Sequence, residues 1–250
     1  MKKFNKTLLV AALMIAAGSA NANISVHNGD SELFMSVYDS SSKNTYSLNT
    51  GLTIDAFIAA ASNSTYAYTH DLSLDAVWTS GFKGAAGFNA ATTSYALIVG
   101  SNVNPDVLLT SSAVGGLVLT DTIDALVSNF QIQAGEVNAS GFDISKVVND
   151  GSIANTGQFK DFDNAFGLQT GAKAAGAYGS ALAFFHATNV PNAAGDELES
   201  HVEQFAGSWT LAGNTLSFSA PAPISAVPLP AAVWFFGAGL MGMLRLNRRK

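Results

Sequence analysis

Residues 208–219, SWTLAGNTLSFS, constrain the fold more tightly than any other segment of the sequence. Polar and apolar residues alternate on both sides of Ala212-Gly213-Asn214, which is the pattern of two antiparallel strands joined by a tight turn. A second alternating pair occupies residues 32–48, where the turn-rich SSSKN separates ELFMSVYD from TYSL. We therefore expect an antiparallel sheet that uses both hairpins.

Helical spacing is restricted to short segments. Residues 121–137 place apolar side chains three and four positions apart, which predicts a helix capped by Asp121. Residues 53–61 predict a shorter helix with Thr53 as its cap. The acid-rich residues 196–205 predict a third, short helix.

Short apolar runs predict further strands at residues 94–99, 116–120 and 180–187. Residues 152–179 are polar and rich in glycine, which favours a long loop. The chain contains no cysteine, so an ordinary hydrophobic core has to hold it together without disulfides. The sequence therefore predicts a β-rich α+β fold, a single domain with an antiparallel sheet and a few short helices over residues 23–219.

The first residues carry the pattern of a secretory signal peptide. Three lysines within residues 1–6 form a positive start, an apolar core follows at residues 7–17, and small residues stand in Ala20-Asn21-Ala22. An apolar core of this length is too short to span a bilayer as an ordinary helix. We expect signal peptidase to remove residues 1–22, so that the remaining chain is exported.

The end of the chain has three parts in order. Residues 220–230 are rich in proline, residues 231–244 are wholly apolar, and four cations follow, namely Arg245, Arg248, Arg249 and Lys250. A helix over the apolar run would be about 21 Å long, shorter than the roughly 30 Å hydrocarbon core unless Arg245 extends to the interface and the bilayer thins. The pattern predicts a linker and then a transmembrane helix with a basic tail over residues 231–250.

This tail resembles the PEP-CTERM sorting signal of Gram-negative bacteria, in the variant that opens with Val-Pro-Leu-Pro-Ala. The resemblance rests on the apolar run, on the terminal cations, and on Val227, Pro228, Leu229, Pro230 and Ala231. It implies recognition by an exosortase, a membrane-embedded cysteine peptidase that cuts near the proline motif. The precursor would be tethered to the inner membrane, and the cut would free it to the cell surface or extracellular matrix, much as a GPI signal is processed. The sequence lacks Pro-Glu-Pro, so the position of the cut stays open.

Removing the two ends changes the charge of the chain. Residues 23–226 hold five lysines, no arginine and all eighteen Asp and Glu residues, a side-chain charge of −13. Nucleic-acid binding depends on Lys and Arg meeting phosphates, so nucleic acid is excluded as a partner. An anionic membrane surface would also repel this body.

Two acidic clusters are candidate sites for Ca²⁺. Asp161 and Asp163 begin like a calcium loop, although Ala165 and the absent closing glutamate exclude an EF-hand. A helix would bring the second cluster to one face, and its candidate ligands are Asp196, Glu199 and Glu203. A solvated acidic face is the simpler interpretation of the second cluster, and no other cofactor is expected.

No catalytic motif stands out in this sequence. His70 and Asp71 are the best adjacent pair for acid–base chemistry, yet an exposed turn explains them equally well. We therefore expect a non-enzymatic protein of the cell surface or extracellular matrix, which acts by adhesion or by association with exopolysaccharide. The alternative is a secreted hydrolase or carbohydrate-binding module whose site is assembled from scattered carboxylates.

Overall fold

The structure is a computed structural model, and it describes residues 24–25, 30–63, 65–102, 105–113, 119, 122–149, 174–191 and 198–220. The expected signal peptide and the whole expected sorting tail lie outside the described residues. In the described part of the chain, no helix combines the length and the apolar character that crossing a membrane requires.

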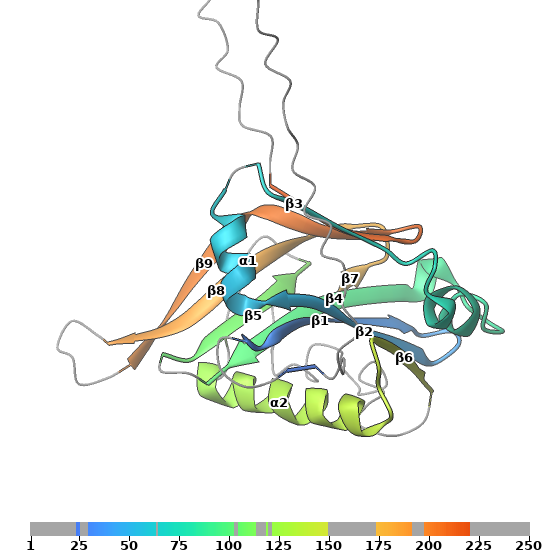
Figure 1. Cartoon of the computed structure of the whole chain (residues 1–250), viewed down its shortest axis with the longest axis horizontal. Coiled ribbons are helices and arrows are strands. Elements are labelled where there is room, and N and C mark those ends of the chain that lie inside the picture. Colours follow the sequence, from blue (N-terminus) through green and yellow to red (C-terminus); the bar gives the residue numbers. More distant parts are fainter. Residues whose placement is uncertain are drawn as a thin grey trace, which may run out of the picture.

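The described residues form a β-rich domain built on one antiparallel sheet (Figure 1). Its strands are β1 Glu32–Asp39, β2 Asn44–Thr53, β3 Ala67–Asp71, β4 Thr93–Ser101, β5 Val107–Ser112, β6 Ser145–Val148, β7 Gly176–Ala177, β8 Ala181–Pro191, β9 Leu198–Ala212 and β10 Thr215–Ser219. The neighbours run in the order β3-β10-β9-β8-β5-β4-β1-β2-β6, and the short β7 pairs with β4. The predicted sheet with both hairpins is confirmed, because β1–β2 and β9–β10 belong to it.

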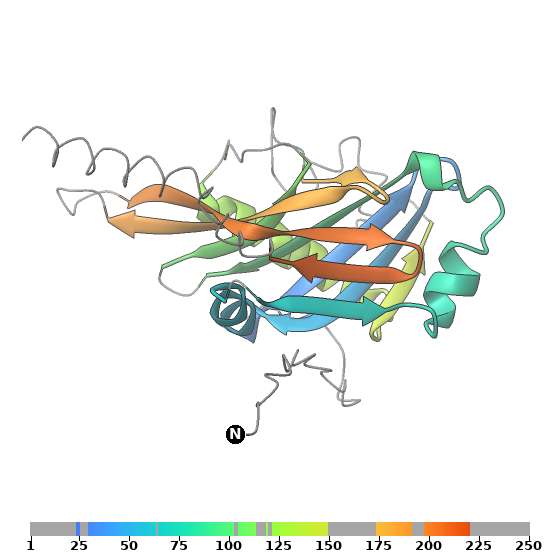
Figure 2. The same ribbon diagram turned by 90° about the horizontal axis from the view of Figure 1, so that it is seen from above.

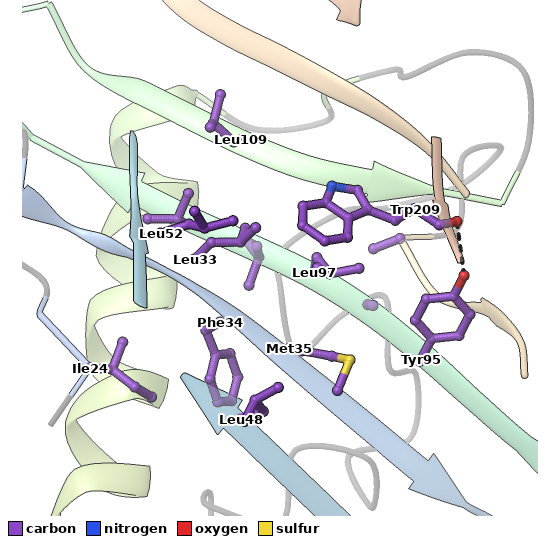
Figure 3. Close-up of a cluster of buried hydrophobic side chains, with 14 of the residues drawn as sticks. Ile24, Leu33, Phe34, Met35, Leu48, Leu52, Tyr95, Leu97, Leu109 and Trp209 are labelled. Carbon is purple, nitrogen blue, oxygen red and sulfur yellow. Dashed lines mark hydrogen bonds between the residues drawn. The ribbon is translucent and has the colours of Figure 1, made fainter. Parts of the chain in front are cut away.

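The sheet is curled, so that strands far apart in its order approach one another. The Tyr95 hydroxyl of β4 donates to the Trp209 carbonyl of β9 at 3.1 Å, across the two intervening strands (Figure 3). The Tyr68 hydroxyl of β3 donates to the Thr50 carbonyl of β2 at 3.1 Å, although these strands lie near opposite ends of the order. The concave face is consequently closed around a packed core.

Helix α1, Ile54–Ala61, packs on the concave face. Thr53 caps it as expected, because its side chain accepts from the Ala56 N–H at 3.3 Å. The helix inserts Phe57 among aromatic rings, with centroid separations of 5.1–5.8 Å to Phe184, Phe205, Trp209 and Phe218. Offset and edge-to-face rings at this spacing stabilise a core beyond their buried area.

Helix α2, Ile123–Ala139, covers the opposite face of the sheet (Figure 1). Gly100 of β4 allows this close approach, since a Cβ there would lie 3.1 Å from the Val127 side chain and 3.3 Å from Phe130. The helix lies where its apolar spacing predicts, but the predicted capping residue, Asp121, is wrong. Thr122 is the capping residue and accepts from the Ala125 N–H, whereas Asp121 lies outside the described residues.

The predicted acidic helix at residues 196–205 is also wrong, because its described part belongs to strand β9. The backbone of this segment pairs residue by residue with β8, as in His186 opposite Glu203, and this pairing requires an extended strand. Strand β5 and the edge strand β6 are not predicted from the sequence, and neither is β7, which lies at the end of the predicted loop 152–179. Of the predicted strand at 116–120, Leu119 alone is described, and it lies outside any strand.

Candidate functional site

Most of the predicted site residues lie outside the described part of the chain. These are the sorting residues Val227, Pro228, Leu229, Pro230 and Ala231, the cations Arg245, Arg248, Arg249 and Lys250, and the acids Asp161, Asp163 and Asp196. Glu199 contributes its backbone to β9, but its side chain is outside the description. Glu203 is the one predicted ligand with a described side chain.

Glu203 lies on a hairpin that projects from the rest of the sheet, and we call residues 186–191 of β8 and 198–207 of β9 the arm (Figure 2). On one side of the arm, β5 accompanies β8 only as far as Thr188, which pairs with Val107. On the other side, β10 accompanies β9 only from Ser208 onward. Among the described residues, no strand pairs with the outer edge of β9 over residues 198–207.

Local sequence explains why the arm begins at Gly207. The β8–β9 register shifts between Ala183 and Phe185, which marks a bulge in β9. Gly207 lies in it beneath the end of β10, where an added Cβ would overlap the Phe218 ring and lie 2.7 Å from the Ser219 carbonyl oxygen. Two residues after Ser219 the chain reaches Pro221, which has no N–H for a sheet ladder, so β10 does not continue along β9.

Three titratable side chains share one face of the arm. His186 is opposite Glu203, and Thr188 is opposite His201, so His186, His201 and Glu203 all stand on that face. The His201 Nε2 lies 3.0 Å from the Glu203 Oε1, and the two side chains are 55% and 66% exposed. Hydrogen bonding with His201 lowers the pKa of Glu203.

His186 stands at the base of the arm, and the sequence did not mark it as a site residue. Its ring stacks on Phe205 at 6.3 Å, and its Nε2 is buried with no hydrogen-bond partner among the described residues. Burial lowers the pKa of His186, although the Glu203 carboxylate opposes this shift. His186 becomes a candidate only through its pairing opposite Glu203 in the sheet, and this pairing cannot be deduced from the sequence alone.

The arm exposes His201 and Glu203 to solvent, while His186 stays partly buried beside them. Within the described part of the chain, no three His, Asp or Glu side chains converge closely enough to hold a metal ion. What the geometry offers is an exposed donor–acceptor pair beside a free strand edge, both available to a partner from outside the molecule.

The predicted acid–base pair, His70 and Asp71, lies in strand β3, so the two side chains project from opposite faces. Neighbouring residues of a strand point to opposite faces. The Nδ1 of His70 hydrogen-bonds with the Tyr68 hydroxyl at 3.2 Å, while the Asp71 carboxylate accepts from the Ser73 N–H at 2.8 Å. Burial lowers the pKa of His70.

A second polar cluster joins β2, the π-helix and the β9–β10 turn. Asp75 accepts from the Tyr46 hydroxyl at 2.7 Å and from the first N–H groups of the π-helix Val77–Phe82. Asn214, in the β9–β10 turn, accepts from the Trp78 indole at 3.1 Å and from Lys83 at 2.9 Å. Trp78 is fully buried, so these contacts anchor the turn to the core.

Comparison of the chain with protein-family models, with characterised proteins and with solved structures finds no match.

Proposed function

We propose that this chain is an exported, non-enzymatic protein of the bacterial cell surface or extracellular matrix, released from the membrane by an exosortase-type peptidase. One observation carries the proposal: a signal-peptide pattern at residues 1–22 is combined with Val227-Pro228-Leu229-Pro230-Ala231, an apolar run and a basic end. The folded domain then acts by adhesion or by association with exopolysaccharide.

Each part of the tail has a physical role in this proposal. Pro228 and Pro230 favour extended backbone, which gives a peptidase a segment with no helix to unwind. The apolar run halts translocation as a membrane helix. The cations Arg245, Arg248, Arg249 and Lys250 stay on the cytoplasmic side, at about 1 kcal/mol for each basic residue near an anionic leaflet.

The properties of the body support the proposed location. Its charge of −13 over residues 23–226 favours solubility outside the cell and repels an anionic membrane surface. The arm adds an exposed edge and polar side chains that project from the sheet, which is a suitable shape for contact with other matrix components.

Calcium binding through Asp161, Asp163, Asp196, Glu199 and Glu203 stays a prediction. A ligand that binds only the folded state raises its stability by mass action, so millimolar Ca²⁺ should raise the Tm of the chain. Magnesium at the same concentration is the matched control, because its small octahedral shell fits such loops poorly. An unchanged Tm in calcium would remove the prediction.

Mass spectrometry of the protein released by its host tests the sorting proposal. We expect a mature chain that begins after Ala22 and ends near the proline motif. Pro228→Ala with Pro230→Ala should leave the protein membrane-bound, whereas Pro221→Ala with Pro223→Ala should not, because these two prolines lie outside the motif. Recovery of released protein that still ends in Lys250 would overturn the proposal.

A further inference from the structure

The outer edge of β9 is long and has no neighbouring strand in the described part of the chain. Over residues 198–207 it has no partner strand among the described residues, and Ser200, His201, Glu203, Gln204 and Ala206 are exposed. An edge of this length presents a row of backbone N–H and C=O groups that can add another strand. An edge that no described strand covers is available to a partner strand, and the side chains along it decide which partner fits.

The side chains on this edge are complementary to a second copy of themselves. When two identical strands pair antiparallel about a two-fold axis normal to the sheet, the axis passes through one residue, since opposed residues must share a face. An axis at His201 places His201 opposite His201, and an axis at Glu203 places Glu203 opposite Glu203. An axis at Val202 instead places His201 opposite Glu203 of the second copy, twice.

The register centred on Val202 also uses the available edge well. It pairs residues 198–206 of both copies, all of them within the unpaired stretch 198–207. It places Val202 opposite Val202 and Ser200 opposite Gln204. It also puts an imidazole, which can donate a hydrogen bond, opposite each Glu203 carboxylate, whereas the register centred on Glu203 would oppose two carboxylates, which is unfavourable. The arm extends past the ends of β5 and β10 (Figure 2), so no described strand lies along its outer edge.

We propose that two copies of this chain associate through their arms, with the β9 edges paired antiparallel about a two-fold axis at Val202. The four strands β8–β9 of one copy and β9–β8 of the other then form a continuous sheet. This proposal goes beyond the proposed function and does not depend on export or on processing of the tail.

Cysteine cross-linking tests the register directly, because the natural chain has no cysteine. Opposed residues of an antiparallel pair have Cα atoms about 4.5–5.5 Å apart, within the roughly 4.4–6.8 Å that a disulfide spans. Under mild oxidation the full-length chain carrying Val202→Cys should form a covalent dimer. Ser200→Cys and Gln204→Cys should each cross-link at least tenfold less alone, yet readily when the two variants are mixed.

Cross-linking is preferred to molecular size as the readout, because the apolar tail can hold full-length chains together in detergent. Failure of Val202→Cys to cross-link, or failure of the Ser200→Cys and Gln204→Cys mixture, would overturn the proposal. It would also fall if Ser200→Cys alone cross-linked as efficiently as Val202→Cys. If other residues of this chain or a different protein covers the edge, these same failures are the result.

A charge exchange provides a second, independent test. His201→Glu should reduce the yield of the Val202→Cys dimer several-fold, because it places a second carboxylate opposite Glu203 of the other copy. Adding Glu203→Lys to that variant should restore the yield, since a carboxylate and an ammonium group then face each other. Both positions are exposed, so the fold tolerates the changes. Equal yields for all three proteins would contradict the proposed register.

Discussion

Strand β9 passes through two different environments. The contrast shows which part of the strand stabilises the core and which part is free to bind a partner. The C-terminal part of β9, Ser208–Ala212, runs between β8 and β10, and Trp209 there is fully buried. The longer N-terminal part, residues 198–207, belongs to the arm, with a strand on one side only and with the Glu203 side chain 66% exposed. One part of the strand therefore contributes to the core, and the other provides a free edge.

The polar groups around these two parts also differ in their surroundings. Near the C-terminal part of β9, where the sheet is closed, Asp75 and Asn214 accept hydrogen bonds from buried aromatic residues, which ties the turns to the core. In the arm, the polar contact between His201 and Glu203 is open to water. Exposed pairs of this kind contribute little to stability, so the His201–Glu203 pair can engage a partner at little cost to the fold.

The largest effect on stability is expected in the C-terminal part of β9, which lies between β8 and β10. Trp209→Ala removes a ring that lies 5.3–5.9 Å from the rings of Phe57, Tyr68, Phe184 and Phe218. We expect a loss of about 3–5 kcal/mol in the free energy of unfolding, measured by denaturant titration. Trp209→Phe is the matched control and should cost much less, because it keeps an aromatic ring and removes a buried N–H with no partner among the described residues. Equal losses would contradict this packing.

The second largest effect on stability is expected at Gly207, between the two parts of β9. Gly207→Ala forces a Cβ against Phe218 and the Ser219 carbonyl, so it should cost about 1–3 kcal/mol by overpacking. Gly135→Ala on α2 is the control, since no atom lies within 4 Å of its Cβ, and it should stabilise by about 0.5–1 kcal/mol. Thermal unfolding of both variants checks the sign, and a stable Gly207→Ala protein would argue against the tight junction.

A smaller effect is expected from acid, through one histidine in each region. Burial lowers the pKa of both His70 and His186 below the ordinary value of 6.5. As pH falls through about 6.5 the unfolded chain therefore binds protons first, so stability is retained above this pH and lost below it. His70→Phe and His186→Phe should each flatten the dependence of stability on pH between about 7.5 and 5, and the double variant more so. An unchanged slope in the double variant would contradict the assignment.

The smallest effect on folding is expected from the exposed pair of the arm. Glu203→Gln removes an exposed partner of His201 and should leave the unfolding midpoint unchanged in denaturant titration. Asp75→Asn is the comparison in the closed region, where the carboxylate accepts from Tyr46 and from two backbone N–H groups, and it should lower the midpoint clearly. Similar midpoints for the two variants would remove the distinction between the regions.

Local features of the fold could be predicted from the sequence because they depend on neighbouring residues. The alternating pairs around Gly213 and around residues 40–43 specify hairpins through strand pattern and turn chemistry. Thr53 caps α1 because its side chain reaches an N–H three residues away. The acidic segment of β9 was mistaken for a helix because a short polar stretch suits either period, and its partner β8 decides between them.

The candidate site was predictable only in part. Glu203 was recognised as one of a group of acids, but the helix expected for them would have joined it to Glu199 rather than to His186. His186 lies in a segment predicted as a buried strand, and only the β8–β9 register places it opposite Glu203. The free edge depends on where β10 ends, and therefore on the packing of Phe218 over Gly207.

By itself, the sequence determined the antiparallel hairpins, helices α1 and α2, the acidic body and the absence of disulfides, because these follow from alternation, apolar spacing and composition. The tertiary structure alone decided that β5 lies between β4 and β8 and that the sheet curls until Tyr95 reaches Trp209. Pairing between distant strands depends on how the whole apolar surface is buried, which no single stretch of residues specifies. The exposed arm is a result of that same burial, since it is the part of β9 that the curled sheet leaves with one neighbour.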